Sequence, residues 1–518
     1  MDDKRVYLFD TTLRDGAQTQ GVDFNPADKE LIAKELDSIG IDYIEGGWPG
    51  ANPTDDAFFK NPPELKRSCL TAFGMTRRAG RSADNDPGLT ALLSTGAKAV
   101  CMVGKAWDFH IKVVLDIEPE ENIAMIRESV TLAAAKADKV IFDAEHFFDG
   151  YKANKDYAVN CLKAAYDAGA HWVVLCDTNG GSLPSEVAAI TAAAREKLSC
   201  NIGIHTHNDI GLGVANALVA VDAGATQVQG TINGYGERTG NCNLISVIPN
   251  ISLKMGKRSI PAAQIRKLRD LSRFVDEVAN LMPDRRQPWV GATAFAHKGG
   301  MHVNAVQKLA QSFEHATPDA VGNKRRILVS DLAGRSNIVM KAQEMGIRVN
   351  NDTPQLKAIL AKVKEQEHLG YDYEGAEGSL ALLIRKALGR VEPAFQLESF
   401  HVSMHGDGVE HVCEATVKVR VGDKTAHTVA DGDGPVNALD HALRNALRGF
   451  YPVLKQVKLT DYKVRILNGG TGTAAKTRVL IESTDGKERW YTVGVDENII
   501  KASLQALMDS IEFRLLKK

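Results

Sequence analysis

Three residues of this sequence have the chemistry and the spacing of a divalent-metal site: Asp15, His205 and His207. One residue separates the two histidines, so that on a β-strand both imidazoles lie on one face and can reach the same cation. Two imidazoles and one carboxylate form a typical divalent site that leaves positions open for a substrate. This ligand set accepts Zn, Mn, Mg or Co, so the sequence predicts a divalent metal without identifying it. Without Asp15, His205 and His207 could equally be two histidines that pack in the core and bind no metal.

Two further residues could complete this site. Asn241 ends the Gly-rich segment Gly236–Asn241 and could add a carbonyl oxygen, although Asn is also a common turn residue in such loops. Arg14 directly precedes Asp15, and a guanidinium beside a metal suits a carboxylate substrate or a developing oxyanion. A surface salt bridge is the alternative for Arg14.

A repeated pattern in the first part of the chain would bring these residues together. Short apolar or β-branched runs alternate there with longer segments rich in Ala and Leu. The runs are Val6–Leu13, Ile41–Trp48, Ser68–Met75, Ala97–Gly104, Lys139–Glu145, Trp172–Thr178, Asn201–His207 and Gln227–Asn233. Such alternation indicates a parallel sheet, and eight units of this length fit a closed (β/α)8 barrel better than an open sheet.

Most of these runs end in polar side chains. In a (β/α)8 barrel the C-terminal ends of the strands meet at one mouth, so these groups would share one site. Besides the metal-site residues, they are Asp10, Glu45, Asp143, Glu145, Asp177, Thr178 and Asn233. The pattern therefore predicts an active site at the mouth of the barrel.

The pattern changes twice further along the chain, which predicts an α/β protein in three parts. We expect a catalytic barrel over 1–255, helical linker subdomains over 256–395 and a regulatory or dimerisation domain over 396–518. The last part contains a strand–strand–strand–helix unit twice, with an offset of 64 that places Thr428 on Thr492. A purely structural module is the alternative for this part.

Composition excludes several classes of protein. The chain has 518 residues and a net charge of -2, which gives no electrostatic reason to expect nucleic acid or an anionic membrane as a partner. No apolar run approaches the ~18 residues of a membrane span, and the charged N-terminus does not resemble a signal peptide. Seven scattered cysteines without a CxxC pair fit a reducing environment, so we expect a cytoplasmic protein.

Three motifs in order give a family resemblance over essentially the whole chain. Thr11–Gln18 (TTLRDGAQ), His205–Asp209 (HTHND) and Gly236–Asn241 (GERTGN) resemble the acyl-CoA-condensing family of 2-isopropylmalate, homocitrate and citramalate synthases. Ile44–Pro53 (IEGGWPGANP) and Phe142–Gly150 (FDAEHFFDG) are most similar to the citramalate branch. The homocitrate branch commonly has Glu at the place of Asp15.

The resemblance implies an acyltransferase that condenses acetyl-CoA with pyruvate in a Claisen-type reaction and hydrolyses the thioester. Asp15, His205, His207 and Asn241 would then bind the metal, which holds pyruvate. Arg14 would steady the keto oxygen, and Thr178 would contact the substrate carboxylate. Glu145 and His302 are the implied groups for activating acetyl-CoA and the hydrolytic water.

Regulation and assembly also follow from the resemblance. The last domain is similar to the family's leucine- or isoleucine-sensing domain, with Asp431, Gly432, Gly434 and Pro435 in its effector loop. For the citramalate branch the implied effector is isoleucine, as feedback on isoleucine biosynthesis. The segment of His302 often reaches the site of a partner subunit in the family, so a homodimer is expected.

Two positions depart from the family pattern. Asn304 stands where the family often has Asp, and Phe313 stands where it commonly has Tyr. Phe313 cannot transfer a proton, so water or a nearby His would have to act as the acid in hydrolysis.

Three other functions stay open. A 2-isopropylmalate synthase would use 2-oxoisovalerate, and one or two methyl groups are worth only roughly 1–3 kcal/mol of discrimination. Phe73, Met75 and Met102 are candidate pocket residues that would decide between these substrates. A metal-dependent aldolase or lyase would run the carbon–carbon step backwards, and an amino-acid sensor with an inactive barrel would not catalyse it.

Overall fold

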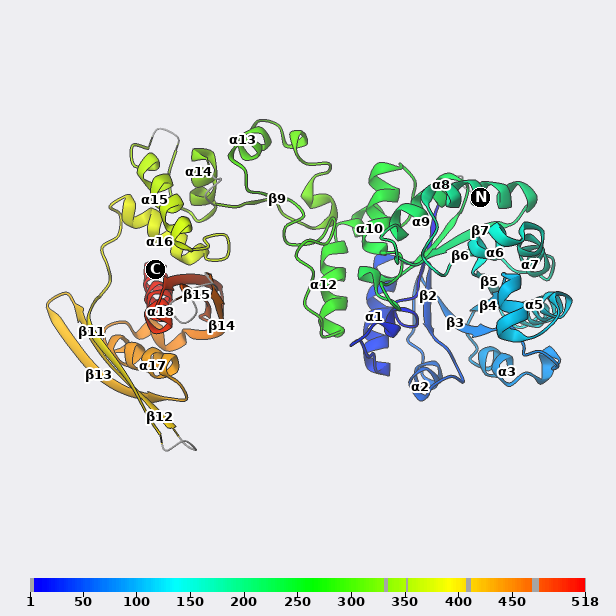
Figure 1. The fold of residues 1–518 in the computed structure, drawn as a ribbon, viewed down its shortest axis with the longest axis horizontal. Helices are drawn as coiled ribbons and strands as arrows, with labels where there is room; N and C mark the ends of the chain where they lie inside the picture. The colour runs from blue at the N-terminus through cyan, green and yellow to red at the C-terminus, as the bar shows by residue number, and fades with distance from the viewer. Residues whose placement is uncertain (1–3, 330–333, 351–352, 407–410, 468–474, 518) are drawn as a thin grey trace. The chain divides into compact units, whose positions relative to one another are not determined.

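The structure is a computed structural model that describes residues 4–329, 334–350, 353–406, 411–467 and 475–517 (Figure 1). The chain forms two compact units. Unit 1 consists of Met1–Phe295 and Ala316–Lys324, and unit 2 consists of Ala296–His315 and Arg325–Lys518. The three-part division at 255 and 395 stays a prediction.

Unit 1 contains the predicted closed barrel of eight parallel strands. The strands are β1 (Tyr7–Asp10), β2 (Tyr43–Gly47), β3 (Cys69–Met75), β4 (Ala99–Lys105), β5 (Lys139–Glu145), β6 (Trp172–Asp177), β7 (Asn201–Thr206) and β8 (Gln227–Gly230). They follow one another in sequence order around the barrel. Four consecutive residues of β1 pair with β8, from Tyr7 with Gln227 to Asp10 with Gly230, which closes the ring.

Helices follow the strands of the barrel. They are α1 (Pro26–Ile39), α2 (Pro53–Lys60), α3 (Pro87–Ser94), α4 (Asp108–His110), α5 (Pro119–Ala134), α6 (Phe147–Ala153), α7 (Lys155–Asp167), α8 (Pro184–Lys197), α9 (Gly213–Asp222), α10 (Leu244–Pro249), α11 (Ala262–Ile265) and α12 (Leu268–Val278). The sequence sets their ends locally. Asn25 and Asp28 form a capping box at the start of α1, and Gly40 ends this helix in the left-handed region at φ 95°.

Two apolar layers hold the barrel together. Side chains that alternate outward along the strands pack against the helices and include Leu8, Ile44 and Met102. The opposite faces of the strands fill the interior, where Phe9, Tyr43, Phe73 and Trp172 form a separate buried cluster. Because successive side chains of a strand point to opposite faces, this alternation decides which residues can reach the mouth of the barrel.

Unit 2 contains the predicted duplication. One antiparallel sheet is β11 (Gln396–Gly406), β12 (His411–Val421) and β13 (Lys424–Gly432), and the other is β14 (Lys458–Ile466), β15 (Thr477–Thr484) and β16 (Arg489–Asp496). A long helix follows each sheet in the sequence: α17 (Pro435–Arg448) follows the first sheet, and α18 (Ile499–Leu516) follows the second. Thr428 donates a hydrogen bond to the carbonyl of Ala442, and Thr492 donates one to the carbonyl of Ala506, both at 2.7 Å. Both residue pairs are 64 positions apart, so the two copies share internal contacts.

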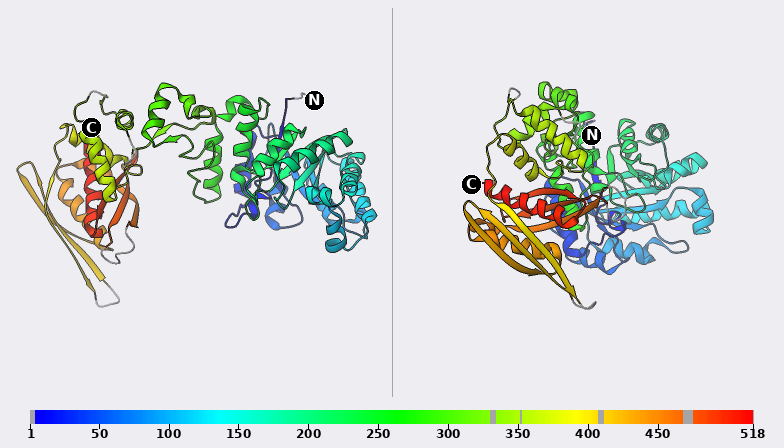
Figure 2. Two further views of the ribbon diagram at one scale, coloured as in Figure 1. Left: turned by 45° about the horizontal axis from the view of Figure 1, so that its top comes forward. Right: turned by 60° about the vertical axis from the view of Figure 1, so that its left-hand side comes forward.

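The remaining elements of unit 2 are mostly helical. They are β9 (Ala296–His297), α13 (Gly300–Lys308), β10 (Arg326–Ile327), α14 (Arg335–Glu344), α15 (Leu356–Leu369) and α16 (Glu377–Ala387). The helices α14 to α16 share one apolar core with Val493 and Val495 of β16. In the right-hand view of Figure 2, the red helix α18 lies against the sheet of β14, β15 and β16.

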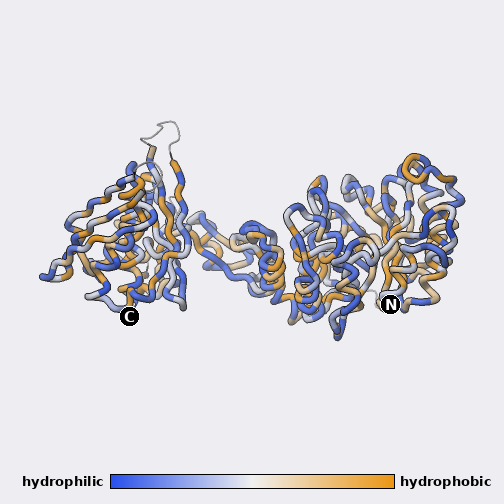
Figure 3. Tube along the Cα trace, turned by 90° about the horizontal axis from the view of Figure 1, so that it is seen from below, coloured by the Kyte–Doolittle hydropathy of each residue, from blue (hydrophilic) through white to orange (hydrophobic). Residues whose placement is uncertain are grey.

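Hydropathy is mixed along both units, with apolar and polar segments alternating along the trace (Figure 3). Within the described part of the chain, no helix has the length and apolar character that crossing a membrane would require.

Candidate active site

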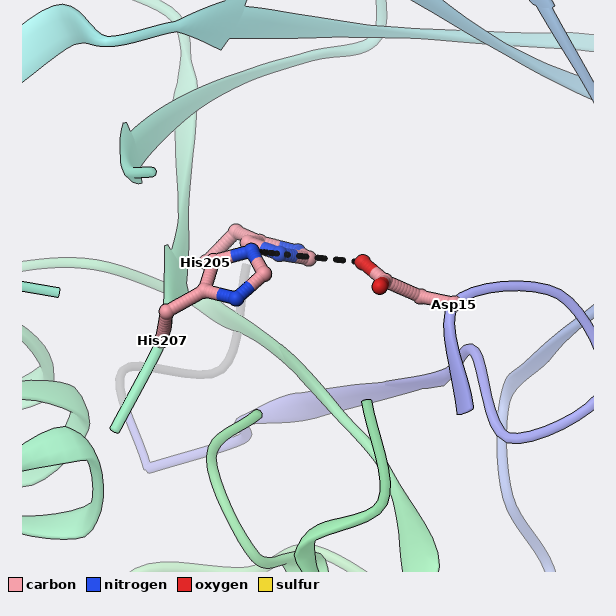
Figure 4. A group of neighbouring side chains, drawn as sticks. All are labelled: Asp15, His205 and His207. Carbon is pink, nitrogen blue, oxygen red and sulfur yellow. Dashed lines mark hydrogen bonds and ion pairs between the residues drawn. The ribbon is translucent and has the colours of Figure 1, made fainter. Parts of the chain in front are cut away.

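The three predicted metal ligands converge at the C-terminal ends of the barrel strands. His205 lies on β7 with His207 just beyond its end, and Asp15 lies in the loop after β1 (Figure 4). His205 Nε2 lies 3.3 Å from His207 Nε2 and 3.6 Å from Asp15 Oδ2. All ligand atoms lie within 4.8 Å of one another, and all three side chains are buried. One cation could therefore contact all three.

The electrostatics of this cluster suit a metal. Burial alone would raise the pKa of Asp15, but Arg14, His205 and His207 together lower it below its usual value. Burial, reinforced by His205, lowers the pKa of His207 to about 3. Metal ligands must be an ionised carboxylate and neutral imidazoles, and the site favours the ionised form of Asp15 and the neutral form of His207.

Asn241 is placed as a fourth ligand would be. It pairs with His207 through an isolated antiparallel β-bridge, and its Nδ2 donates to the carbonyl of Tyr235 at 3.3 Å. Its Oδ1 is buried and accepts no hydrogen bond from any described residue. Gly236 makes room for this amide, because a Cβ there would lie 2.2 Å from Asn241 Nδ2. The donor set of Asp15, His205, His207 and Asn241 therefore fits a divalent cation.

Arg14 is fixed on three sides. Its Nε donates to Glu45 Oε2 at 2.7 Å, and its NH1 lies 3.4 Å from Asp15 Oδ2. Its guanidinium also lies over the ring of Phe73, whose edge contacts Trp48 at a centroid distance of 5.2 Å. A partly buried guanidinium held in this way presents a positive charge beside the candidate metal ligands at little further entropic cost.

Two other predicted residues lie at the mouth of the barrel. Glu145 ends β5 and forms an ion pair with Lys105 at the end of β4. Thr178 follows β6, and its Oγ1 accepts a hydrogen bond of 2.9 Å from the backbone N–H of His146. Because that contact uses an acceptor site, the hydroxyl proton of Thr178 can be donated to a substrate carboxylate.

A cavity of about 450 Å³ opens beside Glu145. Its lining comes from the ends of β2 to β5 and the loops that follow them. It includes Trp48, Met75, Arg77, Arg78, Val103 and Lys105. The lining of the cavity thus contains a candidate base, apolar side chains and cationic side chains.

Some polar groups at the strand ends have structural roles instead. Asp10 accepts hydrogen bonds from the backbone and the hydroxyl of Thr12, and Asp177 binds Ser182. Asn233 donates to Asp276 at 2.7 Å and so ties the barrel to α12. These three residues hold loops and do not join the metal cluster.

The candidate pocket residues are divided between the two faces of the strands. Phe73 packs in the interior, and Met75 lines the cavity beside Glu145. Met102 instead packs outward against the helices, so the interpretation of Met102 as a pocket residue is wrong. Val103, one residue later, faces inward and lines the cavity, because the strand period is two.

The other predicted site residues belong to unit 2. His302 on α13 stacks on Phe313 at a centroid distance of 4.1 Å. Asp431 and Gly432 end β13, Gly434 is the N-cap of α17 and Pro435 is its first residue. The roles of these residues in catalysis and regulation stay predictions.

Sequence reasoning missed two residues of the barrel interior. Gln229 Oε1 lies 2.8 Å from His205 Nδ1, and Lys105 pairs with Glu145. The sequence of β8 contains a signal for Gln229. Gln227 and Gln229 are two residues apart and therefore lie on the same face of the strand. Lys105 ends β4 and had no motif to mark it.

Three family profiles match the chain. The HMGL-like profile matches residues 5–275, the homocitrate synthase post-HMGL domain-like profile matches 289–369, and the LeuA allosteric (dimerisation) domain matches 374–515.

Curated relatives match over almost the full length. The chain is 53% identical to an (R)-citramalate synthase of Geobacter sulfurreducens, with 99% of this chain and 98% of that protein covered. It is 52% identical to an (R)-citramalate synthase of Aquifex aeolicus, with the same coverage of 99% and 98%. A probable 2-isopropylmalate synthase of Methanopyrus kandleri is more distant, at 33% identity with 98% of each chain covered.

Proposed function

Since this chain belongs to the HMGL-like enzymes, in the branch of the citramalate synthases, we propose that it condenses acetyl-CoA with pyruvate and releases citramalate and CoA. A C–H bond of the acetyl methyl group breaks, a C–C bond forms to the keto carbon, and water cleaves the C–S bond of the thioester. The observation that carries this proposal is the buried cluster of Asp15, His205 and His207 beside the fixed guanidinium of Arg14.

The chain's own residues account for the binding of pyruvate. A divalent cation held by the Asp15 cluster and Asn241 would supply Lewis-acid polarisation of the keto group. Arg14 places its positive charge where the keto oxygen becomes an alkoxide, and the hydroxyl of Thr178 donates to the carboxylate. Both groups are positioned before the substrate arrives, which lowers the cost of reorganisation during the reaction.

The second substrate fits the cavity beside Glu145. Its volume of about 450 Å³ has an apolar wall for the thioester arm, and Arg78 at its rim suits a phosphate group. Glu145 is the candidate base that removes the methyl proton, since its carboxylate lines this cavity. Holding both substrates at one mouth supplies much of the rate enhancement that such a reaction needs.

Hydrolysis and assembly involve unit 2. His302 is the candidate group for activating the hydrolytic water, and its stacking on Phe313 fixes the imidazole plane. We assign no acid to this step beyond water, because Phe313 has no proton to transfer. The match to an allosteric (dimerisation) domain over 374–515 supports a homodimer.

The start of α17 supports a role of the effector loop in binding an amino acid. Gly434 is the N-cap of α17 and provides no side-chain cap, whereas Asn498 caps the equivalent helix α18. Pro435 has no N–H, so the backbone N–H groups of Val436 and Asn437 form an N-terminus without a side-chain cap, which attracts a carboxylate. Isoleucine is the effector that we propose for this loop.

A thiol-release assay tests the proposed reaction. Free CoA from acetyl-CoA is measured with a divalent metal and each of pyruvate, 2-oxobutyrate, 2-oxoisovalerate and 2-oxoglutarate. We expect release with pyruvate to exceed release with the other three. Preference for 2-oxoisovalerate would make the chain a 2-isopropylmalate synthase. If metal-loaded protein releases no CoA with any of the four 2-oxoacids, the proposed condensation is rejected.

A further inference from the structure

A chain of buried hydrogen bonds crosses the interior of the barrel below the metal cluster. Asp143 on β5 accepts from Gln229 Nε2 on β8 at 2.9 Å, and Gln229 Oε1 lies 2.8 Å from His205 Nδ1 on β7. All three side chains are at most 5% exposed. β5 is not a neighbour of β8 in the sheet, so the side chains themselves span the interior.

The chemistry of these groups fixes the direction of each hydrogen bond. An ionised carboxylate only accepts, so Asp143 draws the NH2 group of Gln229 toward itself. The amide oxygen of Gln229 then faces His205 and can only accept, so His205 Nδ1 must carry the proton. A neutral imidazole protonated at Nδ1 keeps its lone pair on Nε2. Nε2 is the atom that faces Asp15 and His207.

We propose that Gln229, anchored by Asp143, is a positioning residue that holds His205 in the Nδ1–H tautomer and thereby presents Nε2 to the metal. The inference rests on the proposed function only in that a metal binds at Asp15, His205 and His207. A hydrogen-bond acceptor behind a metal-binding histidine orients the ring and raises its affinity for the metal. His207 contrasts with His205, because its Nδ1 is buried and has no partner among the described residues.

The chain offers a matched control in Gln227. This residue lies two positions earlier on β8, faces the same interior and is fully buried. Neither atom of its amide has a hydrogen-bond partner among the described residues. Replacing Gln227 by Met therefore tests the effect of losing a buried amide from this strand without touching His205.

Two measurements that do not depend on activity test the proposal: the affinity for Mn²⁺, from titration, and the tautomer of His205 in the metal-free protein. Gln229→Met should weaken Mn²⁺ binding by about 10- to 100-fold. The nitrogen NMR signals of labelled His205 should show Nδ1–H in the wild type and lose that preference in the variant. Gln227→Met should change neither readout.

The outcomes separate this inference from the proposed reaction. Mn²⁺ affinity within twofold of the wild type in Gln229→Met, or weaker binding with the tautomer of His205 unchanged, would overturn it. If Gln229→Met does not fold, Gln229→Asn withdraws the amide from His205 by one methylene and is read in the same way. A failed condensation assay alongside the expected affinity and tautomer changes would reject the proposed reaction and leave the role of Gln229 standing.

Discussion

The guanidinium of Arg14 lies 3.9 Å from the centre of the ring of Phe73. With Glu45 bound to its Nε, the cation is held between an aromatic face and a buried carboxylate. A flat guanidinium can make both contacts and still direct other N–H groups to a substrate, whereas an ammonium is a single point charge. These contacts therefore hold the guanidinium of Arg14 in one orientation.

Replacing Arg14 by Lys should retain the charge and lose the orientation. We expect kcat with pyruvate to fall by about 10²- to 10³-fold, which is typical for removing one charge-stabilising donor. Phe73→Leu should cause a smaller loss of about tenfold, because an aromatic–cation contact is worth about 0.5–2 kcal/mol. Steady-state kinetics at saturating acetyl-CoA measures both. Near-normal turnover in Arg14→Lys would contradict the assignment.

Removal of the metal should stop turnover and lower the thermal stability. Binding of a ligand to the folded state alone stabilises it in proportion to the logarithm of ligand excess. A chelator should therefore lower the melting temperature of the wild type, and added Mn²⁺ should restore it. His207→Ala should melt at the temperature of the chelated wild type and should not respond to Mn²⁺; a preserved response would remove His207 from the ligand set.

Enlarging the cavity beside Glu145 should shift the preference among acyl-CoA substrates, because this cavity is the one proposed for the thioester arm. Met75 and Val103 line it, so Val103→Ala should raise kcat/KM for propionyl-CoA relative to acetyl-CoA by about tenfold. Met102→Leu is the matched control, because Met102 packs outward against the helices. An unchanged ratio in Val103→Ala, or an equal change in Met102→Leu, would place the pocket elsewhere.

Asp10 should make the protein less stable as the pH rises. Burial raises the pKa of Asp10 from 3.8 to about 7, and the hydrogen bonds from Thr12 offset only part of this. The folded state then holds this proton more tightly than the unfolded chain, so its contribution is complete below pH 4 and is lost as pH rises through 7. Asp10→Asn has no such proton, so its melting temperature relative to the wild type should rise between pH 4 and pH 8.

Asp86 provides the control of opposite sign for this measurement. Burial would raise its pKa, but hydrogen bonds from the backbone of Arg78, Leu89 and Gly88 lower it below 3.8. Its contribution to stability is therefore present above pH 4 and is lost at lower pH. Asp86→Asn should be less stable than the wild type at pH 8 and closer to it at pH 3. A parallel pH profile for the two variants would contradict both assignments.

Isoleucine should inhibit the enzyme and raise its melting temperature if the uncapped N-terminus of α17 holds the effector. A Cβ at Gly432 would lie 2.3 Å from the backbone nitrogen of Ala438, so Gly432→Ala should abolish the shift in melting temperature. Asn498→Ala removes the cap of α18 and should cost about 1 kcal/mol while leaving the response to isoleucine intact. Absence of any effect of millimolar isoleucine on the wild type would reject the effector.

The fold was predictable because its signals are local. Most barrel strands are short apolar runs followed by a helix, and Asn25 and Gly40 show for α1 how local residues set the ends of such a helix. The cluster of Asp15, His205 and His207 was predictable because one residue separates the two histidines at the end of a strand. The strand ends of a closed barrel also share one mouth, which brings Asp15 to them.

Side-chain partners across the barrel were not predictable from spacing. Gln229 reaches Asp143 over a sequence distance of 86, and no local pattern encodes that contact. Asn233 follows a strand as a metal ligand would, yet its amide binds α12. The error at Met102 has a simpler cause, since a strand alternates faces and a shift of one residue exchanges inside for outside.

The path of the chain between the two units has a consequence for the order in which they are made. Ala316–Lys324 returns to unit 1 after Ala296–His315 has been contributed to unit 2. The returning segment buries Val321 in the barrel core, and Asn323 donates to the carbonyls of Trp289 and Gly291. A growing chain cannot finish unit 1 until residue 324 has left the ribosome, so the barrel matures while part of its successor is already synthesised. A shortened gene for the barrel alone should therefore end after the codon for Lys324.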